Sequence, residues 1–168
     1  MKILTYKDIL NEQQNILRKD LSWWPNFLYH FTDVHNASSI LYNGWIFSRE
    51  EAEKQKIMVS DINASCPVPI FFCLNASAVL EYEGTKFAER GIAGHRSDIK
   101  NGVEEFQKLQ FRKIYHEGPM GMEHDITEYR HSEVIREGGF PVEPFLQCIL
   151  CRTQAERETL MFLSKMDD

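Results

Sequence analysis

The chain has 168 residues, 43% of them apolar and 12% aromatic, so it can bury one substantial core, and we expect residues 1–168 to form a single domain. Its net charge of −6 argues against a broad basic surface for duplex nucleic acid, but it allows a pocket for one extruded base or a single-stranded end. No apolar segment approaches the roughly 20 residues that cross a bilayer, and the N-terminus lacks a signal-peptide pattern, so we expect a cytoplasmic protein with no membrane partner.

The first third of the chain alternates helix and strand patterns. Residues 7–21 predict an amphipathic helix in the N-terminal segment 1–24, because their apolar side chains lie near one face at helical spacing and their charges lie opposite. The apolar residues on this face are Ile9, Leu10, Ile16, Leu17 and Leu21. Residues 27–31 form an apolar run after Trp-Trp-Pro and predict a buried strand. Next come a two-turn helix that begins at Asp33 or Asn36 and ends at Gly44, a strand at 45–47 and a charged surface helix at 49–58.

The rest of the chain predicts fewer regular elements. Strand patterns occur at 68–73, 131–136 and 145–151, and helix patterns at 76–82 and 103–114. Glycines recur through the segment 84–124 without a sustained period, so we expect most of it to be loop.

The last helix has a clear start signal. Thr153 and Glu156 form a T-x-x-E capping box, after which Leu160, Met161 and Leu163 are expected to point inward. Short strands, few long helices and long loops together predict a compact α+β domain.

Four cysteines allow two interpretations. Cys148 and Cys151 make a Cys-x-x-Cys pair that, with Cys66 and Cys73, offers four thiolates for zinc. However, Cys73 and Cys148 lie in apolar runs of strand length, and free cysteine is commonly a small buried hydrophobic residue. We therefore expect structural thiols, no metal and no disulfides.

Three polar residues have no role in this scaffold. His30 lies within the apolar run at 27–31, and Thr32 follows directly after it. Glu133 lies within a predicted strand that enters the core. An exposed strand glutamate and a carboxylate placed in a cleft both fit the pattern around Glu133. The common motifs for nucleotide binding, serine hydrolysis and zinc proteolysis are absent from the sequence.

Three blocks of the sequence occur in the order of a known family. They are YHFTDVHNASSILYNGWIFS at 29–48, VPIFFC at 68–73 and HSEVI at 131–135. They resemble DarT, the family of ADP-ribosyltransferase toxins that use NAD to modify bases in single-stranded DNA. The resemblance implies a single ADP-ribosyltransferase-like domain with a central split, mostly antiparallel sheet flanked by helices, and a substrate-facing region at 84–124.

The resemblance also implies roles for individual residues. Glu133 would be the catalytic carboxylate, and His30 and Thr32 would contact the nicotinamide amide or the ribose. The other expected NAD contacts are Tyr29, Phe31, Asn36, Gly44, Ser48 and Phe72. Nicotinamide leaves as a neutral group, so no metal is implied.

The sequence departs from the family at a second catalytic residue. DarT carries an arginine in a loop before the V-P-F-Y-F-C strand, whereas the loop here reads SDINASCP. Arg49 is the nearest upstream candidate for this role. Arg130 is another, and with His131 it is a candidate contact for nucleic acid.

The expected function is therefore mono-ADP-ribosylation of a nucleobase in single-stranded DNA or RNA, by a bacterial toxin or phage-defence effector with a cognate antitoxin. Two alternatives stay open: an ADP-ribosyltransferase that acts on protein, and an inactive module that binds NAD or another protein. The missing loop arginine is the feature that favours the inactive module.

Overall fold

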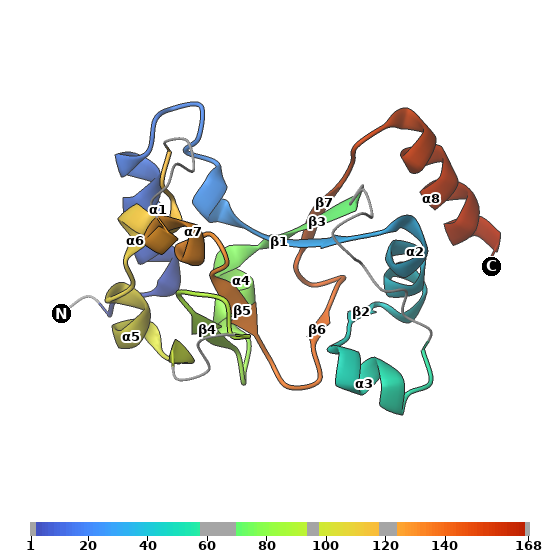
Figure 1. Cartoon of the computed structure of the whole chain (residues 1–168), viewed down its shortest axis with the longest axis horizontal. Coiled ribbons are helices and arrows are strands. Elements are labelled where there is room, and N and C mark those ends of the chain that lie inside the picture. Colours follow the sequence, from blue (N-terminus) through green and yellow to red (C-terminus); the bar gives the residue numbers. More distant parts are fainter. Residues whose placement is uncertain (1–2, 58–69, 94–97, 118–123, 167–168) are drawn as a thin grey trace. The chain divides into compact units, whose positions relative to one another are not determined.

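The computed structural model describes residues 3–57, 70–93, 98–117 and 124–166 (Figure 1). Internal contacts divide the chain into two compact units, and each unit combines two separate stretches of sequence. Unit 1 contains residues 1–27 and 76–136, and unit 2 contains residues 28–75 and 137–168. Among the described helices, none has the length and apolar character needed to span a membrane.

Unit 1 is mainly helical. Its elements are α1 (Tyr6–Ile16), the 3-10 helix η1 (Trp24–Asn26), α4 (Ala76–Glu81), β4 (Lys86–Ala88), α5 (Val103–Gln107), α6 (Phe111–Ile114), α7 (His124–Tyr129) and β5 (Glu133–Ile135). Helix α1 begins with a capping box, in which Thr5 and Asp8 satisfy each other's backbone N–H groups.

Helix α1 is shorter than the sequence predicted. It ends at Ile16, whose side chain is 64% exposed, because Leu17 takes an extended backbone conformation. The following residues form turns instead: the Leu21 N–H donates to the Arg18 carbonyl, and the Trp23 indole donates to the Asp20 carbonyl. The predicted inward position of Ile16 was therefore wrong.

An aromatic cluster forms the core of unit 1. The Phe106 ring packs edge-on against Tyr6, Phe87 and Phe111, with centroid distances of 5.2, 5.0 and 5.2 Å. All four side chains are buried. Edge-to-face pairs contribute about 0.5–1.5 kcal/mol each beyond the burial itself, so Phe106 joins α1, α5, α6 and β4.

Strand β4 lies in the segment that was expected to be loop. It pairs antiparallel with β5, and the register places Lys86 opposite Ile135 and Ala88 opposite Glu133. Phe87 also exchanges two backbone hydrogen bonds with Lys100, at 2.9 and 2.8 Å. The helix predicted at 103–114 is two helices, since the chain turns at Lys108 and buries Leu109 between α5 and α6.

Unit 2 contains the larger sheet. Its elements are β1 (Phe27–Thr32, of which Phe27 falls in unit 1), α2 (Val34–Asn43), β2 (Trp45–Ile46), α3 (Arg49–Lys54), β3 (Ile70–Asn75), β6 (Phe140–Pro141), β7 (Leu146–Cys151) and α8 (Gln154–Met166). The strand order in the sheet is β1-β3-β7, and β3 and β7 run antiparallel. Ile70 and Phe72 of β3 are completely buried, which makes this strand the centre of the core of unit 2.

Helix α2 forms as the sequence predicted. Of the two possible N-caps, Asp33 is the one used: its carboxylate accepts hydrogen bonds from the N–H groups of His35 and Asn36. Gly44 ends the helix with φ +69°, in the left-handed region that glycine enters without steric cost.

A second glycine permits a strand pair that the sequence did not predict. Strands β2 and β6 pair antiparallel, with Ile46 opposite Phe140. Gly139, just before β6, has φ +90°, and a Cβ built there would fall on the Ile46 carbonyl oxygen and lie 2.9 Å from Phe47 Cα. A larger residue at position 139 cannot approach β2 so closely.

Helix α8 begins at the predicted capping box, with the Thr153 N–H donating to Glu156 at 2.9 Å and the Glu156 N–H donating to Thr153 Oγ1 at 3.2 Å. Leu160 is buried as predicted, but Met161 is 44% exposed, so the predicted inward position of Met161 was wrong. The α+β class with antiparallel strand pairing is confirmed.

Candidate active site

The candidate residues divide between the two units, and Glu133 belongs to unit 1. Glu133 opens β5 opposite Ala88 and is half-buried. Its Oε1 accepts a hydrogen bond from the Ile92 N–H at 3.3 Å. The loop after β4 thus fixes one oxygen of this carboxylate, which sets its orientation before any substrate arrives.

This loop comes close to Glu133 because residue 91 is glycine. A Cβ built at Gly91 would lie 3.2 Å from His131 Cβ and 3.4 Å from Glu133 Oε1. A larger side chain would push the loop outward and lengthen the bond between Ile92 and Glu133. Gly91 and Ile92 were not among the predicted site residues, and the only signal for them is the glycine-rich run GIAG at 91–94.

Arg90 connects the same loop to its neighbours. Its guanidinium lies 2.7 Å from the Asp98 carboxylate, whose side chain is 16% exposed, and 3.4 Å from Glu128 in α7. The hydrogen bond to Asp98 is the main reason that the pKa of Arg90 is raised. Arg90 therefore holds the loop in position.

Arg130 and His131, the predicted nucleic-acid contacts, have different surroundings. The Arg130 guanidinium lies over the Trp24 ring at 4.8 Å and donates to the His116 carbonyl. Burial lowers the pKa of Arg130, and its Nε has no hydrogen-bond partner among the described residues. His131 is exposed, so it is the one that presents its side chain to solvent.

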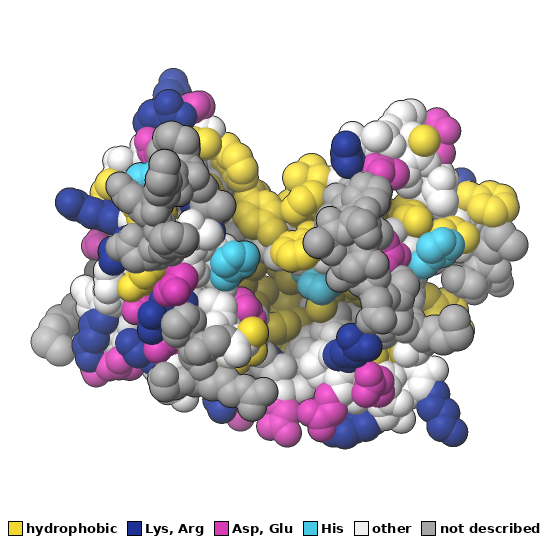
Figure 2. Space-filling model, viewed as in Figure 1, with side chains coloured by type: hydrophobic (Ala, Val, Ile, Leu, Met, Phe, Trp, Pro, Cys, Tyr) yellow, Lys and Arg dark blue, Asp and Glu magenta, His cyan; other side chains and the backbone are white. Residues whose placement is uncertain are grey.

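Other basic residues of unit 1 are engaged locally. Lys108 pairs with Glu105 at 2.5 Å, and Lys113 lies over the Tyr129 ring at 4.8 Å. Tyr129 is only 7% exposed, so its ring is not available to stack a base. Figure 2 shows basic and acidic side chains interspersed over the face of unit 1 in view.

Three of the predicted NAD residues share one face of the β1-β3-β7 sheet in unit 2. Strand alternation directs His30 and Thr32 to the same side, and the His30 ring lies 6.4 Å from the buried ring of Phe72. Burial lowers the pKa of His30, which favours the neutral imidazole. Thr32 is 1% exposed. This face places uncharged polar side chains next to an aromatic ring, with Thr32 and Phe72 packed in the core.

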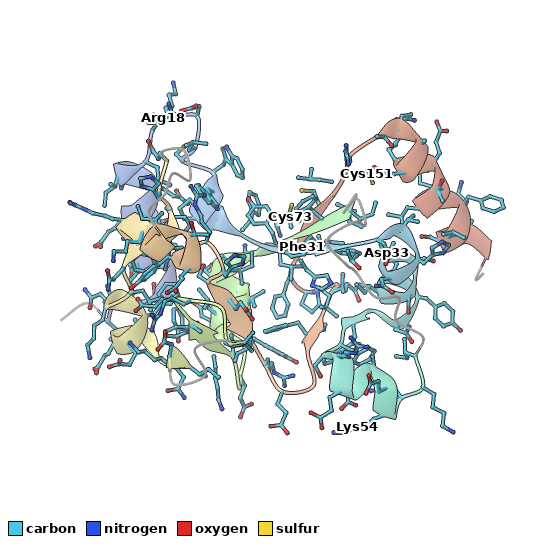
Figure 3. All side chains as sticks on the ribbon, viewed as in Figure 1. Arg18, Phe31, Asp33, Lys54, Cys73 and Cys151 are labelled. Atoms are coloured by element: carbon cyan, nitrogen blue, oxygen red, sulfur yellow. The ribbon has the colours of Figure 1, made fainter. Side chains whose placement is uncertain are left out.

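Tyr29 and Phe31 point to the opposite face. The Phe31 ring lies 6.3 Å from Phe71 and is 55% exposed at the end of β1 (Figure 3). The pKa of Tyr29 is raised, first by burial and then by Cys73 and Cys148. Side chains on this face cannot share a pocket with His30, so Tyr29 and Phe31 could contribute only backbone groups to such a pocket.

The predicted residues near α2 have structural roles. Asn36 is 7% exposed, and its N–H donates to Asp33 Oδ1 at 2.9 Å. The Gly44 carbonyl accepts a hydrogen bond from the Val142 N–H at 2.9 Å, which joins the end of α2 to the segment after β6.

Ser48 and Arg49 form the start of α3. The Ser48 hydroxyl caps the helix by accepting from the Glu51 N–H at 3.2 Å. The Arg49 side chain is 73% exposed and pairs with Glu53 at 3.2 Å, one helical turn away. Exposed pairs of this kind contribute little to stability, so Arg49 can leave Glu53 at small cost.

No group of three or more metal-ligating side chains occurs within the described ranges. Cys73, Cys148 and Cys151 are free thiols. Cys66 and the loop SDINASCP lie outside the described residues, and so does the predicted strand start at 68–69.

Neither the protein-family models nor the curated proteins include a match to this chain. Among solved structures, DarT of Thermus sp. 2.9 in complex with NAD+ is similar, with a TM-score of 0.64 and 15% identity over 86% of this chain and 90% of that chain. The complex of the same protein with carba-NAD+ gives a TM-score of 0.63, 15% identity and coverage of 86% and 91%. The resemblance to DarT is thus confirmed in the fold: this chain has the α+β fold of DarT over most of its length.

Proposed function

We propose that this protein is an NAD-dependent mono-ADP-ribosyltransferase that modifies a nucleobase in single-stranded DNA or RNA, acting in the cytoplasm as a bacterial toxin or phage-defence effector. The observation that carries the proposal is a fold shared with an NAD+-bound DarT over 86% of the chain. The anchored carboxylate of Glu133 supports it, because this reaction requires a preorganised negative charge.

In this proposal NAD would supply the ADP-ribosyl group and nicotinamide as a neutral leaving group. His30 and Thr32 would bind the nicotinamide amide or the ribose, with Phe72 as an apolar wall. Uncharged donors and acceptors suit an amide, and the lowered pKa of His30 keeps its ring neutral. Tyr29, Phe31, Asn36, Gly44 and Ser48 complete the proposed set of NAD contacts, the first two through their backbone.

Glu133 would act as the catalytic carboxylate. Positive charge develops on the ribose when its bond to nicotinamide breaks, and a carboxylate stabilises that charge electrostatically. The same group would accept the proton that the attacking base nitrogen loses. The Ile92 N–H would hold one carboxylate oxygen in place during both events.

Fewer residues are candidates for binding the acceptor. His131 is exposed two residues from Glu133 and would contact the nucleic acid together with its neighbour Arg130. Arg49 is the candidate for the second catalytic residue, because its exposed pair with Glu53 is easily exchanged for a substrate phosphate. A cognate antitoxin protein would be needed to protect the cell.

The test is incubation of the purified protein with labelled NAD and, separately, single-stranded DNA, RNA and denatured lysate protein. Label should appear on one nucleic acid, and Glu133→Gln should reduce the rate about 100-fold or more, the usual effect of removing a preorganised charge. Glu143→Gln, at an exposed acidic residue of unit 2, is the matched control and should leave the rate unchanged. Label on protein alone would establish the alternative acceptor.

An inactive module is the second candidate. The observation that favours it is the pairing of Arg49 within its own helix, together with the absence of arginine from the sequence SDINASCP. NAD binding by calorimetry without transfer to any acceptor would establish this candidate. The absence of both binding and transfer would reject the proposed function.

A further inference from the structure

Two cysteines face each other across the sheet of unit 2. Cys73 of β3 and Cys148 of β7 are direct partners in the antiparallel register. Directly opposite residues in such a pair have Cα atoms about 4.5 or 5.5 Å apart, and a disulfide needs about 4.4–6.8 Å. The register, which shifts between Cys73 and Leu74, therefore brings the two backbones to about the separation that a disulfide spans, and both residues are free thiols.

The Cys148 thiol also acts on the ionisation of Cys73. The pKa of Cys73 is raised to about 12, first by burial and then by a hydrogen bond with Cys148. Both cysteines act on the pKa of Tyr29, which places all three side chains on one face of the sheet. The register and the effect of Cys148 on Cys73 both indicate that the two thiols are neighbours on this face.

The two thiols differ in their access to solvent. Cys148 is exposed, whereas Cys73 is 2% exposed. A dissolved reagent therefore meets Cys148 first, and Cys73 can react only with a group already attached to Cys148. An exposed thiol backed by a buried resolving thiol is the arrangement expected of a reversible dithiol site.

We propose that Cys73 and Cys148 form a redox-active dithiol site that reacts with small disulfides such as oxidised glutathione and closes to a reversible cross-strand disulfide. The Cys148 thiolate attacks one sulfur of oxidised glutathione, and one glutathione thiolate leaves. The Cys73 sulfur, after loss of its proton to solvent, then attacks the Cys148 sulfur and displaces the second glutathione. The protein loses two electrons and two protons, and oxidised glutathione is reduced to two glutathione molecules.

The order of the two steps predicts an intermediate. The high pKa of Cys73 leaves little of its reactive thiolate near neutral pH, so ring closure is slower than the attack by Cys148. A mixed disulfide between Cys148 and glutathione should accumulate first. Raising the pH should speed the closure.

Cys151 provides an internal comparison. It lies at the α8 end of β7, three residues from Cys148, and its partner across the sheet is Ile70 (Figure 3). Strand alternation directs it to the face opposite Cys148. Burial raises its pKa as well, but Cys151 is only half-buried and has Ile70 opposite it instead of a thiol.

The experiment uses the full chain with Cys66→Ser, since Cys66 lies outside the described residues. The protein is incubated with oxidised glutathione, the remaining thiols are alkylated, and intact mass and non-reducing peptide maps are recorded over time. We expect a glutathione adduct on Cys148, then a Cys73–Cys148 cross-link that dithiothreitol reverses. Adding Cys151→Ser should change neither product.

Variants separate the steps. Cys73→Ser should stop at the Cys148 adduct, and Cys148→Ser should leave Cys73 unmodified, with at least a tenfold slower uptake of glutathione. The proposal is overturned if Cys73 and Cys148 stay fully alkylatable, or if the cross-link uses Cys151. The peptide map of the protein without either substitution decides the matter even if a serine variant fails to fold. These outcomes are independent of whether the protein transfers ADP-ribose.

Discussion

The backbone N–H of Ile92 fixes the orientation of the Glu133 carboxylate. The absence of a side chain at Gly91 allows this N–H to approach the carboxylate. Gly91→Ala should therefore lower kcat of the proposed transfer about tenfold, equivalent to about 1.4 kcal/mol, while binding of NAD is unchanged. Ile92→Ala keeps the N–H and is the matched control, with kcat close to that of the original protein. Equal rates for both variants would show that the loop does not position Glu133.

His30 should make folding stability depend on pH. Burial lowers its pKa in the folded protein below the ordinary value of 6.5, so below about pH 6.5 the unfolded chain binds more protons than the folded one. The free energy of unfolding should therefore fall as the pH drops through this range. His30→Asn removes the titrating group, so urea unfolding of the two proteins at about pH 7.5 and about pH 5.5 should show a smaller fall for the variant. An equal fall in the free energy of unfolding for both proteins would show that a group other than His30 causes the pH dependence.

The residues of the candidate site could be predicted only where they carry the chemistry themselves. Glu133 and His30 stand out because a carboxylate and an imidazole interrupt apolar runs. Gly91 and Ile92 contribute an absent Cβ and a backbone N–H, and the sequence does not show which glycine or which N–H comes close to Glu133. The opposite orientation of Phe31 and His30 follows from strand alternation, which the resemblance alone did not take into account.

Helices whose start signals lie close together in the sequence were predicted well, whereas strand pairs between segments far apart in the sequence were not. Helices α2 and α8 have caps within their first turn, at Asp33 and Thr153, so a short window of sequence defines where they begin. Strand β4 has only three residues and pairs with β5, where Lys86 lies opposite Ile135 and Ala88 lies opposite Glu133. No local pattern can specify a partner at that separation.

The β2–β6 pair offers a sharp test of one such distant contact. Gly139→Ala should lower the free energy of unfolding by about 3 kcal/mol, because its Cβ would overlap the Ile46 carbonyl in addition to the strain of a positive φ. Gly138→Ala is the matched control, since Gly138 has φ +79° but nothing within 4 Å of a Cβ; it should cost about 1 kcal/mol. Chemical denaturation measures both, and similar values would argue against the close approach.

For the molecule as a whole, we expect no dependence on a bound metal. The described residues contain no metal-ligating cluster, and three of the four cysteines are free thiols in strands β3 and β7. Dialysis against a zinc chelator should leave both the melting temperature and NAD-dependent transfer unchanged. A fall in the melting temperature of several degrees, restored by zinc, would revive the four-cysteine site.

The chain passes between the two units after residues 27, 75 and 136, so neither unit is a continuous piece of sequence. During synthesis on the ribosome, this arrangement delays the folding of both cores. Strand β4 can pair only after β5 has been synthesised. Strand β3, with its fully buried Ile70 and Phe72, can pair only after β7, about 75 residues later, since Cys73 pairs with Cys148. A nascent chain that stops before residue 133 exposes the apolar surfaces of both units at once, which makes it a substrate for chaperones and proteases rather than a partly working protein.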